Sequence, residues 1–153
     1  MKLWRICRKR YVDSAFSGIG AERDGGRWNL PGHAMVYTST SLSLATLELF
    51  VNLKPQLAPP DLYWVSAELP DDACCETIAA TDLPFDWQAY PAPKELRELG
   101  SRWLNEQRSL ALIVPSAVNP LENNVLLNPR HAEIHTLDKI ESEPFQFDPR
   151  MWN

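Results

Sequence analysis

The stretch that decides the fold is "GGRWNLPGHAMVYTSTSLSLATLELF", residues 25–50, in which a turn, a strand and a helix follow one another. The paired glycines favour a turn, and "AMVYTS" (34–39) has the composition of a β-strand. Thr40 or Ser41 can cap the helix that follows, and Pro55 is expected to end it. This order of elements anchors the interpretation of the rest of the chain.

Glu48 is unusual because it is the only formally charged residue between positions 28 and 53. On a helix, Leu44, Leu47 and Val51 lie three or four residues from it and place it beside an apolar stripe. A carboxylate there loses water, and its pKa is expected to rise unless a donor or a cation lies nearby. The alternative is an edge position that reaches solvent or pairs with a structural arginine.

Outside this stretch the pattern alternates between strands and helices. Strands are expected at 2–7, 62–69, 110–115, 123–127, 133–140 and 144–148. Residues 12–26 suit a loop or short helix, and 92–107 suit an amphipathic helix with Pro93 near its first turn. Without repeats or a linker, the sequence predicts one α+β domain over 1–153, with a mixed, mainly antiparallel β core and a few helices.

The composition is that of an ordinary globular protein with an acidic balance. The 153 residues carry a net charge of −5, which disfavours a broad nucleic-acid surface. Neither a membrane span nor the apolar region of a signal peptide is evident, so the cytoplasm is the expected location. The three cysteines form no metal or disulfide pattern, and a strand-like segment around His135 argues against a His131–His135 metal site.

Arg27 and Tyr37 are candidate ligand contacts on either side of the turn and strand. Gly26 lets backbone N–H groups line a concave anion site, where Arg27 could bind a pyrophosphate with two donors. The alternative is a hairpin turn with a surface arginine and with Trp28 in the core. Tyr37 could stack on a planar heterocycle, although a tyrosine in a strand more often packs in the core.

Three further positions are considered from their place in the chain. Ser116 ends a buried strand, and without a neighbouring histidine a hydrogen-bonding role suits it better than a nucleophilic one. Arg5 lies in the basic cluster "RICRKR", which suits a solvated strand end or a local anion contact. Asn124 lies in a segment rich in Asn and Pro, which by itself indicates only turns and capped ends.

The motifs "LWRI", "GGRWN", "VYTS", "LATLE" and "PSAVNPLENNVLLNP" occur in the order and spacing of the RES-domain family, which this chain resembles over Leu3–Pro129. Members of that family are toxins of bacterial toxin–antitoxin pairs, encoded with a helix-turn-helix antitoxin of the Xre type. Their fold is similar to that of the diphtheria-toxin type of ADP-ribosyltransferase. The resemblance therefore implies this fold and a toxin function.

The resemblance also implies which residues form the site. Arg27, Tyr37 and Glu48 would form the catalytic triad, and Ser116 would be a fourth site residue. The expected additional substrate contacts are Arg5, Gly26, Trp28 and Asn124. NAD would be the substrate, with no separate cofactor and no metal, and the nicotinamide–ribose bond would be cleaved. The Xre antitoxin would cover the active site without direct nucleic-acid or membrane contact by this chain, and a homodimer within the complex is compatible with this arrangement.

Alternatives remain open for the reaction. The acceptor of the ADP-ribose group could be water or phosphate, or it could be a host protein, as in at least one subgroup of the family. A non-catalytic module that binds only the antitoxin or a nucleotide is a third alternative. A ribonuclease is disfavoured by the acidic balance.

Overall fold

A computed structural model describes residues 1–54 and 57–152, which include seven strands in one sheet of order β4-β5-β6-β2-β1-β3-β7. The strands are β1 (Lys2–Arg8), β2 (Val36–Ser39), β3 (Leu62–Glu68), β4 (Cys75–Thr77), β5 (Ala111–Pro115), β6 (Asn123–Leu127) and β7 (Asp138–Pro144). The β4–β5 pair is parallel and the others are antiparallel. The expected α+β class with a mixed, mainly antiparallel sheet is confirmed.

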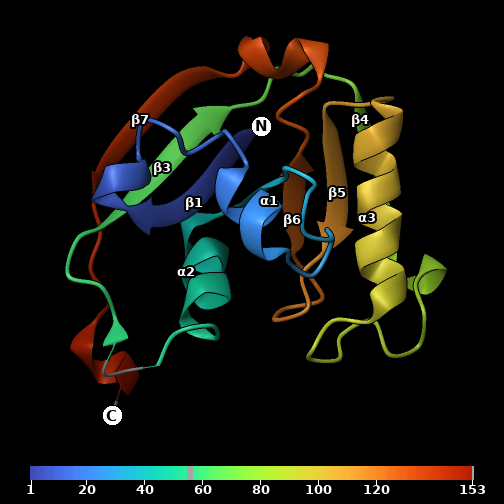
Figure 1. Ribbon diagram of the computed structural model, residues 1–153. Coiled ribbons are helices and arrows are strands. Elements are labelled where there is room, and N and C mark those ends of the chain that lie inside the picture. The colour runs from blue at the N-terminus through green and yellow to red at the C-terminus, as the bar shows by residue number, and fades with distance from the viewer. Residues whose placement is uncertain (55–56, 153) are drawn as a thin grey trace.

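Three α-helices accompany the sheet, together with short 3₁₀ helices. The α-helices are α1 (Ile19–Asp24), α2 (Leu42–Phe50) and α3 (Lys94–Glu106), and the 3₁₀ helices are η1 (Lys9–Tyr11), η3 (Ala80–Asp82), η4 (Ala132–Thr136) and η5 (Pro149–Trp152). In Figure 1, α3 lies beside β5, while α1 and α2 lie near the middle of the sheet. Across the described residues, no helix is both long and apolar enough to cross a membrane.

The sheet divides between β1 and β2. β1 pairs with β3 through seven residue pairs, but with β2 only through Trp4 and Ser39. Beyond that single pair the two strands diverge, so the backbone between them is not closed by a ladder of hydrogen bonds. Figure 1 shows the result as β1, β3 and β7 on one side and β5, β6 and α3 on the other. This divide is where a ligand site can open.

Two of the three clusters of buried side chains hold most of the sheet in place. One packs the apolar face of α3 against the sheet: Leu96, Trp103 and Leu104 belong to the same cluster as Leu112 and Leu126. The second contains Leu3, Val36, Leu110, Val125 and Leu127. Burial of this apolar surface, which stabilises the fold by roughly 25 cal/mol per Å², is the main force that holds β2 and β6 in position.

The helix α2 forms where the sequence predicts it, and its start is fixed by a cap. The Ser41 side chain accepts a hydrogen bond of 3.0 Å from the Leu44 amide, so the expected Ser41 cap is confirmed. The helix ends at Phe50, whose ring packs on Phe147 and Trp152 near the C-terminus. The expected end at Pro55 lies outside the described residues.

The tail differs from the sequence prediction at two places. The strand expected over 133–140 is wrong in its first half, which forms η4, because the His131 side chain accepts a hydrogen bond from the Glu133 amide and caps a helical turn. The strand expected over 144–148 is also wrong, since β7 ends at Pro144. Phe147 beyond it is buried in the aromatic cluster around Phe50 instead of pairing with a strand.

Candidate active site

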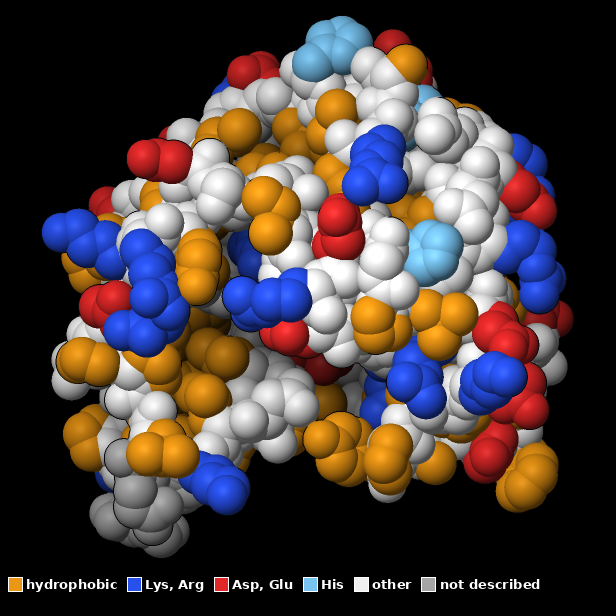
Figure 2. Space-filling view, in the orientation of Figure 1, with side chains coloured by type: hydrophobic (Ala, Val, Ile, Leu, Met, Phe, Trp, Pro, Cys, Tyr) orange, Lys and Arg blue, Asp and Glu red, His pale blue; other side chains and the backbone are white. Residues whose placement is uncertain are grey.

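A cavity of about 1160 Å³ opens at the divide between β1 and β2. This volume is slightly above the range of roughly 300–1,000 Å³ typical of small-molecule sites. In Figure 2 this face of the molecule is hollowed, with basic side chains near the rim. Seven of the eight candidate residues line the cavity: Arg5, Gly26, Arg27, Trp28, Tyr37, Glu48 and Asn124.

Glu48 reaches the cavity from α2, and two neutral side chains hold its carboxylate. Its Oε1 accepts hydrogen bonds from Ser116 Oγ at 2.7 Å and from Asn124 Nδ2 at 2.6 Å. Ser39 Oγ donates to Asn124 Oδ1 at 2.7 Å and so fixes which end of that amide faces Glu48. Both of these hydrogen bonds end on Oε1, and among the described residues Oε2 has no hydrogen bond.

Ser116, the eighth candidate, lies behind Glu48 and does not line the cavity. It directly follows β5, and its residue is fully buried. Its Oγ accepts hydrogen bonds of 3.1 Å from the amides of Val118 and Asn119 and donates its single proton to Glu48. The geometry is that of a residue that orients the carboxylate and does not itself reach the cavity.

Tyr37 projects from β2, and its hydroxyl group both donates and accepts a hydrogen bond. The hydroxyl donates to Asn29 Oδ1 at 2.6 Å and accepts from the Trp28 amide at 3.0 Å. Burial raises the pKa of Tyr37, so the phenol stays protonated. Gly26 approaches closely, because a Cβ built there would lie 2.6 Å from Tyr37 Oη. The turn at Gly26 therefore leaves no room for a side chain beside the Tyr37 ring.

Arg27 is fixed by two carbonyl groups from a loop far along the chain. Its Nη1 donates to Trp87 O at 2.9 Å and to Ala89 O at 3.0 Å. Burial lowers the pKa of Arg27, and the nearby charge of Glu48 opposes this shift. The hydrogen bonds found among the described residues use only Nη1, which leaves the rest of the guanidinium group available to an anion.

Two residues of the site behave differently from the sequence prediction or were missed by it. Trp28 is 2% exposed and belongs to the core, which agrees with the alternative given for this residue in the sequence analysis. Only its backbone amide donates a hydrogen bond within the site. Asn29 was not predicted, yet its amide group donates to the carbonyls of Ala21 and His33 and receives the Tyr37 proton. The sequence gives no indication of this role, because asparagine in a turn is common.

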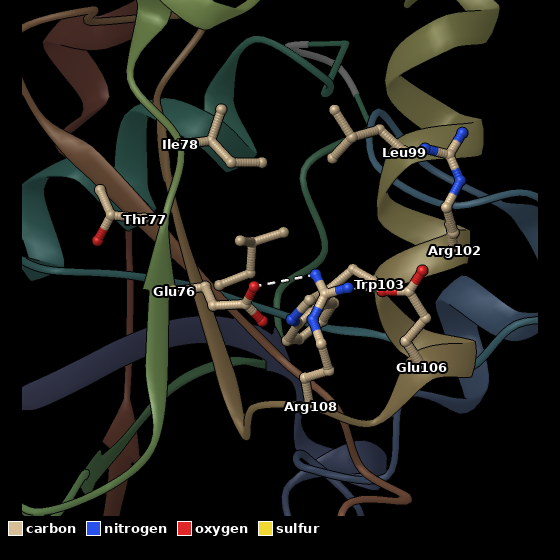
Figure 3. Close-up of a pocket in the computed structure, with 9 residues that line it drawn as sticks. Glu76, Thr77, Ile78, Leu99, Arg102, Trp103, Glu106 and Arg108 are labelled. Atoms are coloured by element: carbon tan, nitrogen blue, oxygen red, sulfur yellow. Dashed lines mark hydrogen bonds and ion pairs between the residues drawn. The ribbon is translucent and has the colours of Figure 1, made fainter.

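A second, smaller hollow of about 250 Å³ lies between β4 and α3, with its lining shown in Figure 3. Here Glu76 accepts hydrogen bonds from Arg108 Nη2 at 3.0 Å and from Ser109 Oγ at 2.6 Å. Trp103 Nε1 donates to the same serine at 2.8 Å, and Arg108 also pairs with Glu106. The charged groups at this hollow thus largely neutralise one another.

The donor set gives no candidate for a metal site. No group of three or more His, Cys, Asp or Glu side chains that could hold a metal ion occurs among residues 1–54 and 57–152. The cysteines in positions 7, 74 and 75 are all free. The large cavity offers the Glu48 carboxylate, the Tyr37 phenol and several guanidinium groups.

Comparison with known structures supports the fold. The crystal structure of the M. tuberculosis MbcT–MbcA toxin–antitoxin complex matches with a TM-score of 0.76 over 99% of this chain and 86% of that chain. The sequence identity is 16%, so this likeness concerns the arrangement of strands and helices alone.

Comparison with known sequences covers almost the whole chain. The family model for the RES domain matches residues 2–148. "Toxin Res" of Yersinia enterocolitica is 41% identical over 99% of both chains. The "Prs ADP-ribosylating toxin" of Sphingobium sp. is 38% identical over 97% of this chain and 94% of that protein. The chain therefore belongs to the RES-domain family, as the spacing of its motifs predicts.

Proposed function

We propose that this protein is the toxin of a bacterial toxin–antitoxin pair and that it depletes NAD by cleaving the nicotinamide–ribose bond. The observation that carries the proposal is the Glu48 carboxylate, which is held by two neutral donors at the wall of a large cavity shared with Arg27 and Tyr37. The relatives named "Toxin Res" support the toxin function. The reaction itself is inferred from the chemistry of the site.

The carboxylate acts on the charge that develops as the bond breaks. When the C1′–N1 bond of the nicotinamide riboside unit breaks, its electron pair leaves with nicotinamide, which becomes neutral, and the ribose becomes an oxocarbenium-like cation. Water or phosphate then attacks C1′ and the acceptor loses its proton. A carboxylate about 4 Å from the cation at an effective dielectric near 20 stabilises it by roughly 4 kcal/mol. That corresponds to about three powers of ten in rate.

The neighbouring residues bind and orient the substrate in this proposal. Arg27 binds the pyrophosphate with the guanidinium donors that the Trp87 and Ala89 carbonyls leave free. Tyr37 offers the face of its ring to nicotinamide, because its hydroxyl is already fixed by Asn29. Ser116 and Asn124 act through Glu48, since both donate to its Oε1. This step uses NAD as substrate and needs no further cofactor.

We propose that an antitoxin binds this chain and covers the cavity. The solved neighbour is a toxin in complex with its antitoxin, which supports such a partner for this chain. We assign the partner to the Xre helix-turn-helix type, in line with the motif resemblance. Co-expression with the adjacent reading frame should yield a complex in which NAD cleavage is lower than in the free chain.

Product analysis tests the reaction directly. The purified chain is mixed with NAD, with and without phosphate, and products are identified by mass spectrometry. Release of nicotinamide with ADP-ribose, or with ADP-ribose phosphate when phosphate is present, is expected. Stable NAD under all these conditions contradicts the proposal and favours a module that only binds a nucleotide or an antitoxin. A labelled-RNA substrate that is cleaved while NAD persists would instead favour a ribonuclease.

A second candidate function is transfer of ADP-ribose to a protein. It is favoured by the relative named "Prs ADP-ribosylating toxin", which is 38% identical over 97% of this chain. The same site would serve, with a protein side chain in place of water as the group that attacks C1′. Incubation of a cell extract with NAD labelled in its adenylate part separates the two. Label bound covalently to protein supports transfer, and label only in small molecules supports degradation.

A further inference from the structure

The helix α2, which carries Glu48, is short and is only partly covered by the rest of the fold. The structure describes all nine of its residues, and of these only Leu44 and Ala45 are buried, both in its first half. Helices shorter than about 12–15 residues are marginal in water, so most of their stability comes from tertiary packing. Glu48 lies in the second half of α2, which therefore needs packing contacts other than those of Leu44 and Ala45.

Aromatic side chains from the C-terminal tail cover the last turn of α2. The centroid of the Phe50 ring lies 6.0 Å from that of Phe147 and 4.8 Å from that of Trp152. Phe147 and Trp152 also contact each other edge to face, with their centroids 5.4 Å apart. Aromatic rings attract one another at these separations. We call Phe50, Phe147 and Trp152 the C-terminal aromatic cluster.

Hydrogen bonds hold the tail in the position from which it reaches α2. The Phe145 amide donates to the carbonyl of Leu62 at 2.8 Å and ties the segment after β7 to the start of β3. In the segment that leads into η5, the Asp148 carboxylate accepts hydrogen bonds from the amide and from Nε of Arg150, at 2.9 and 3.0 Å. In Figure 1 this turn is the red helix at the lower left, next to the C-terminus. Trp152 is therefore presented to α2 by an ordered turn.

The helix α2 lies at the divide in the sheet and is held from both sides of it. It contacts β1 and β2, the two strands that separate there. From the side of β5 and β6, Ser116 and Asn124 donate hydrogen bonds to the Glu48 carboxylate. From the side of β1, β3 and β7, the tail packs its aromatic rings on Phe50. Because Phe50 is two residues after Glu48, a displacement of this end of the helix also displaces the carboxylate.

We infer that the C-terminal aromatic cluster positions Glu48 for the reaction by holding the last turn of α2. The inference rests on the proposed function, in which the Glu48 carboxylate must face the ribose carbon C1′. A misplacement of about 1 Å in a catalytic group can cost roughly a hundredfold in rate. Trp152 is thus a positioning residue that acts through Phe50, and loss of its ring allows the last turn of α2 to open locally.

Kinetics of Trp152 variants of the full chain test this inference. Trp152→Ala removes the ring contact with Phe50, so kcat for nicotinamide release should fall about tenfold or more. KM should stay within about twofold, because Arg27 and Tyr37 are anchored by other segments. Trp152→Phe keeps an aromatic ring and should retain kcat within about threefold of wild type. Phe85→Ala is the control, because Phe85 is fully exposed and does not line the large cavity, and both constants should then match those of wild type.

Amide hydrogen exchange measures the order of the helix without NAD. The Val51 amide, which donates to the carbonyl of Leu47 at 3.1 Å, should exchange about tenfold faster in Trp152→Ala, while the amides of α3 keep their rates. Unchanged kcat in this folded variant, or a rise in KM alone, overturns the inference. Equally faster exchange in α2 and α3 also overturns it, because the loss is then global. Stable NAD with the wild type would overturn only the proposed function, and exchange at Val51 would then decide whether the cluster holds α2.

Discussion

Two carboxylates in this molecule are each bonded to a serine, but they differ in what else surrounds them. Glu76, at the small hollow, is bonded to Ser109 and also to the guanidinium of Arg108. Glu48, at the large cavity, is bonded to Ser116 and to the amide of Asn124, both neutral. A carboxylate paired with a cation has little charge left to offer a ligand. One fixed by neutral donors keeps its charge.

A position at a surface hollow does not by itself distinguish a structural acid from one that can act on a ligand. Both acids have short hydrogen bonds and both lie at hollows in the surface. The two acids differ in whether a cation pairs with the carboxylate. Glu48 has no such partner among the described residues, so its electric field is directed at the cavity, where it can stabilise a developing cation. Glu76 instead joins β4 to the segment after α3, which suggests a structural role.

The largest expected effect is the loss of NAD cleavage when the charge of Glu48 is removed, with the same change at Glu76 as the comparison. Glu48→Gln keeps the size of the side chain and removes its charge, so NAD cleavage should fall by about three powers of ten. Glu76→Gln should leave the cleavage rate within about twofold, because its charge does not face the cavity. Initial rates of nicotinamide release, with circular dichroism to check folding, measure both. Equal losses in the two variants would remove the distinction drawn between them.

A second test concerns the neutral donors that orient Glu48. Asn124→Ala and Ser116→Ala each remove a hydrogen bond to a charged group, and such bonds are typically worth about 1.5–3 kcal/mol. We expect kcat to fall roughly tenfold to a hundredfold with KM little changed, because these residues act through Glu48 and not on bound substrate. Ser109→Ala, which removes the corresponding donor to Glu76, is the matched control. A rise in KM with unchanged kcat would instead show direct contact with substrate.

The sequence predicts the local parts of this site well. The cap at Ser41 and the apolar helix around Glu48 depend on neighbouring residues, and both appear where expected. The turn before Arg27 also forms, with Gly26 close to Tyr37. Such features depend on near neighbours in the chain, which a sequence displays directly.

The parts that the sequence could not predict depend on contacts between distant segments. Ser39 and Asn124 meet because β2 pairs with β6, and no local pattern reveals that register. The divide between β1 and β2, which opens the cavity, is likewise a property of the assembled sheet. Asn29 has an ordinary local setting, a turn, so its place in the site became visible only in the fold.

A third test changes the packing of the cavity wall and leaves its charges in place. A Cβ at Gly26 would lie 2.6 Å from Tyr37 Oη, whereas one at Gly20 would meet no atom within 4 Å. Gly26→Ala should therefore lower stability by about 1–3 kcal/mol, a typical cost of overpacking. Gly20→Ala in α1 should be neutral or slightly stabilising. Chemical denaturation of both variants measures the difference, and equal stabilities would show that Tyr37 moves freely.

The smallest expected effect is the pH dependence that Glu76 gives to stability. The hydrogen bond from Ser109, and then Arg108, holds the pKa of Glu76 below its ordinary value. A carboxyl group with a lowered pKa stabilises the fold fully above the ordinary pKa of glutamate, and this contribution is lost as pH falls through the lowered value. Wild-type protein should thus exceed Glu76→Gln in stability at about pH 7 by a margin that shrinks toward about pH 3. Because the Glu76 side chain is 36% exposed, solvent screens the pair and keeps the margin small. A margin independent of pH in denaturant titrations would show that Arg108 does not compensate this acid, and the contrast with Glu48 would then rest on the large cavity alone.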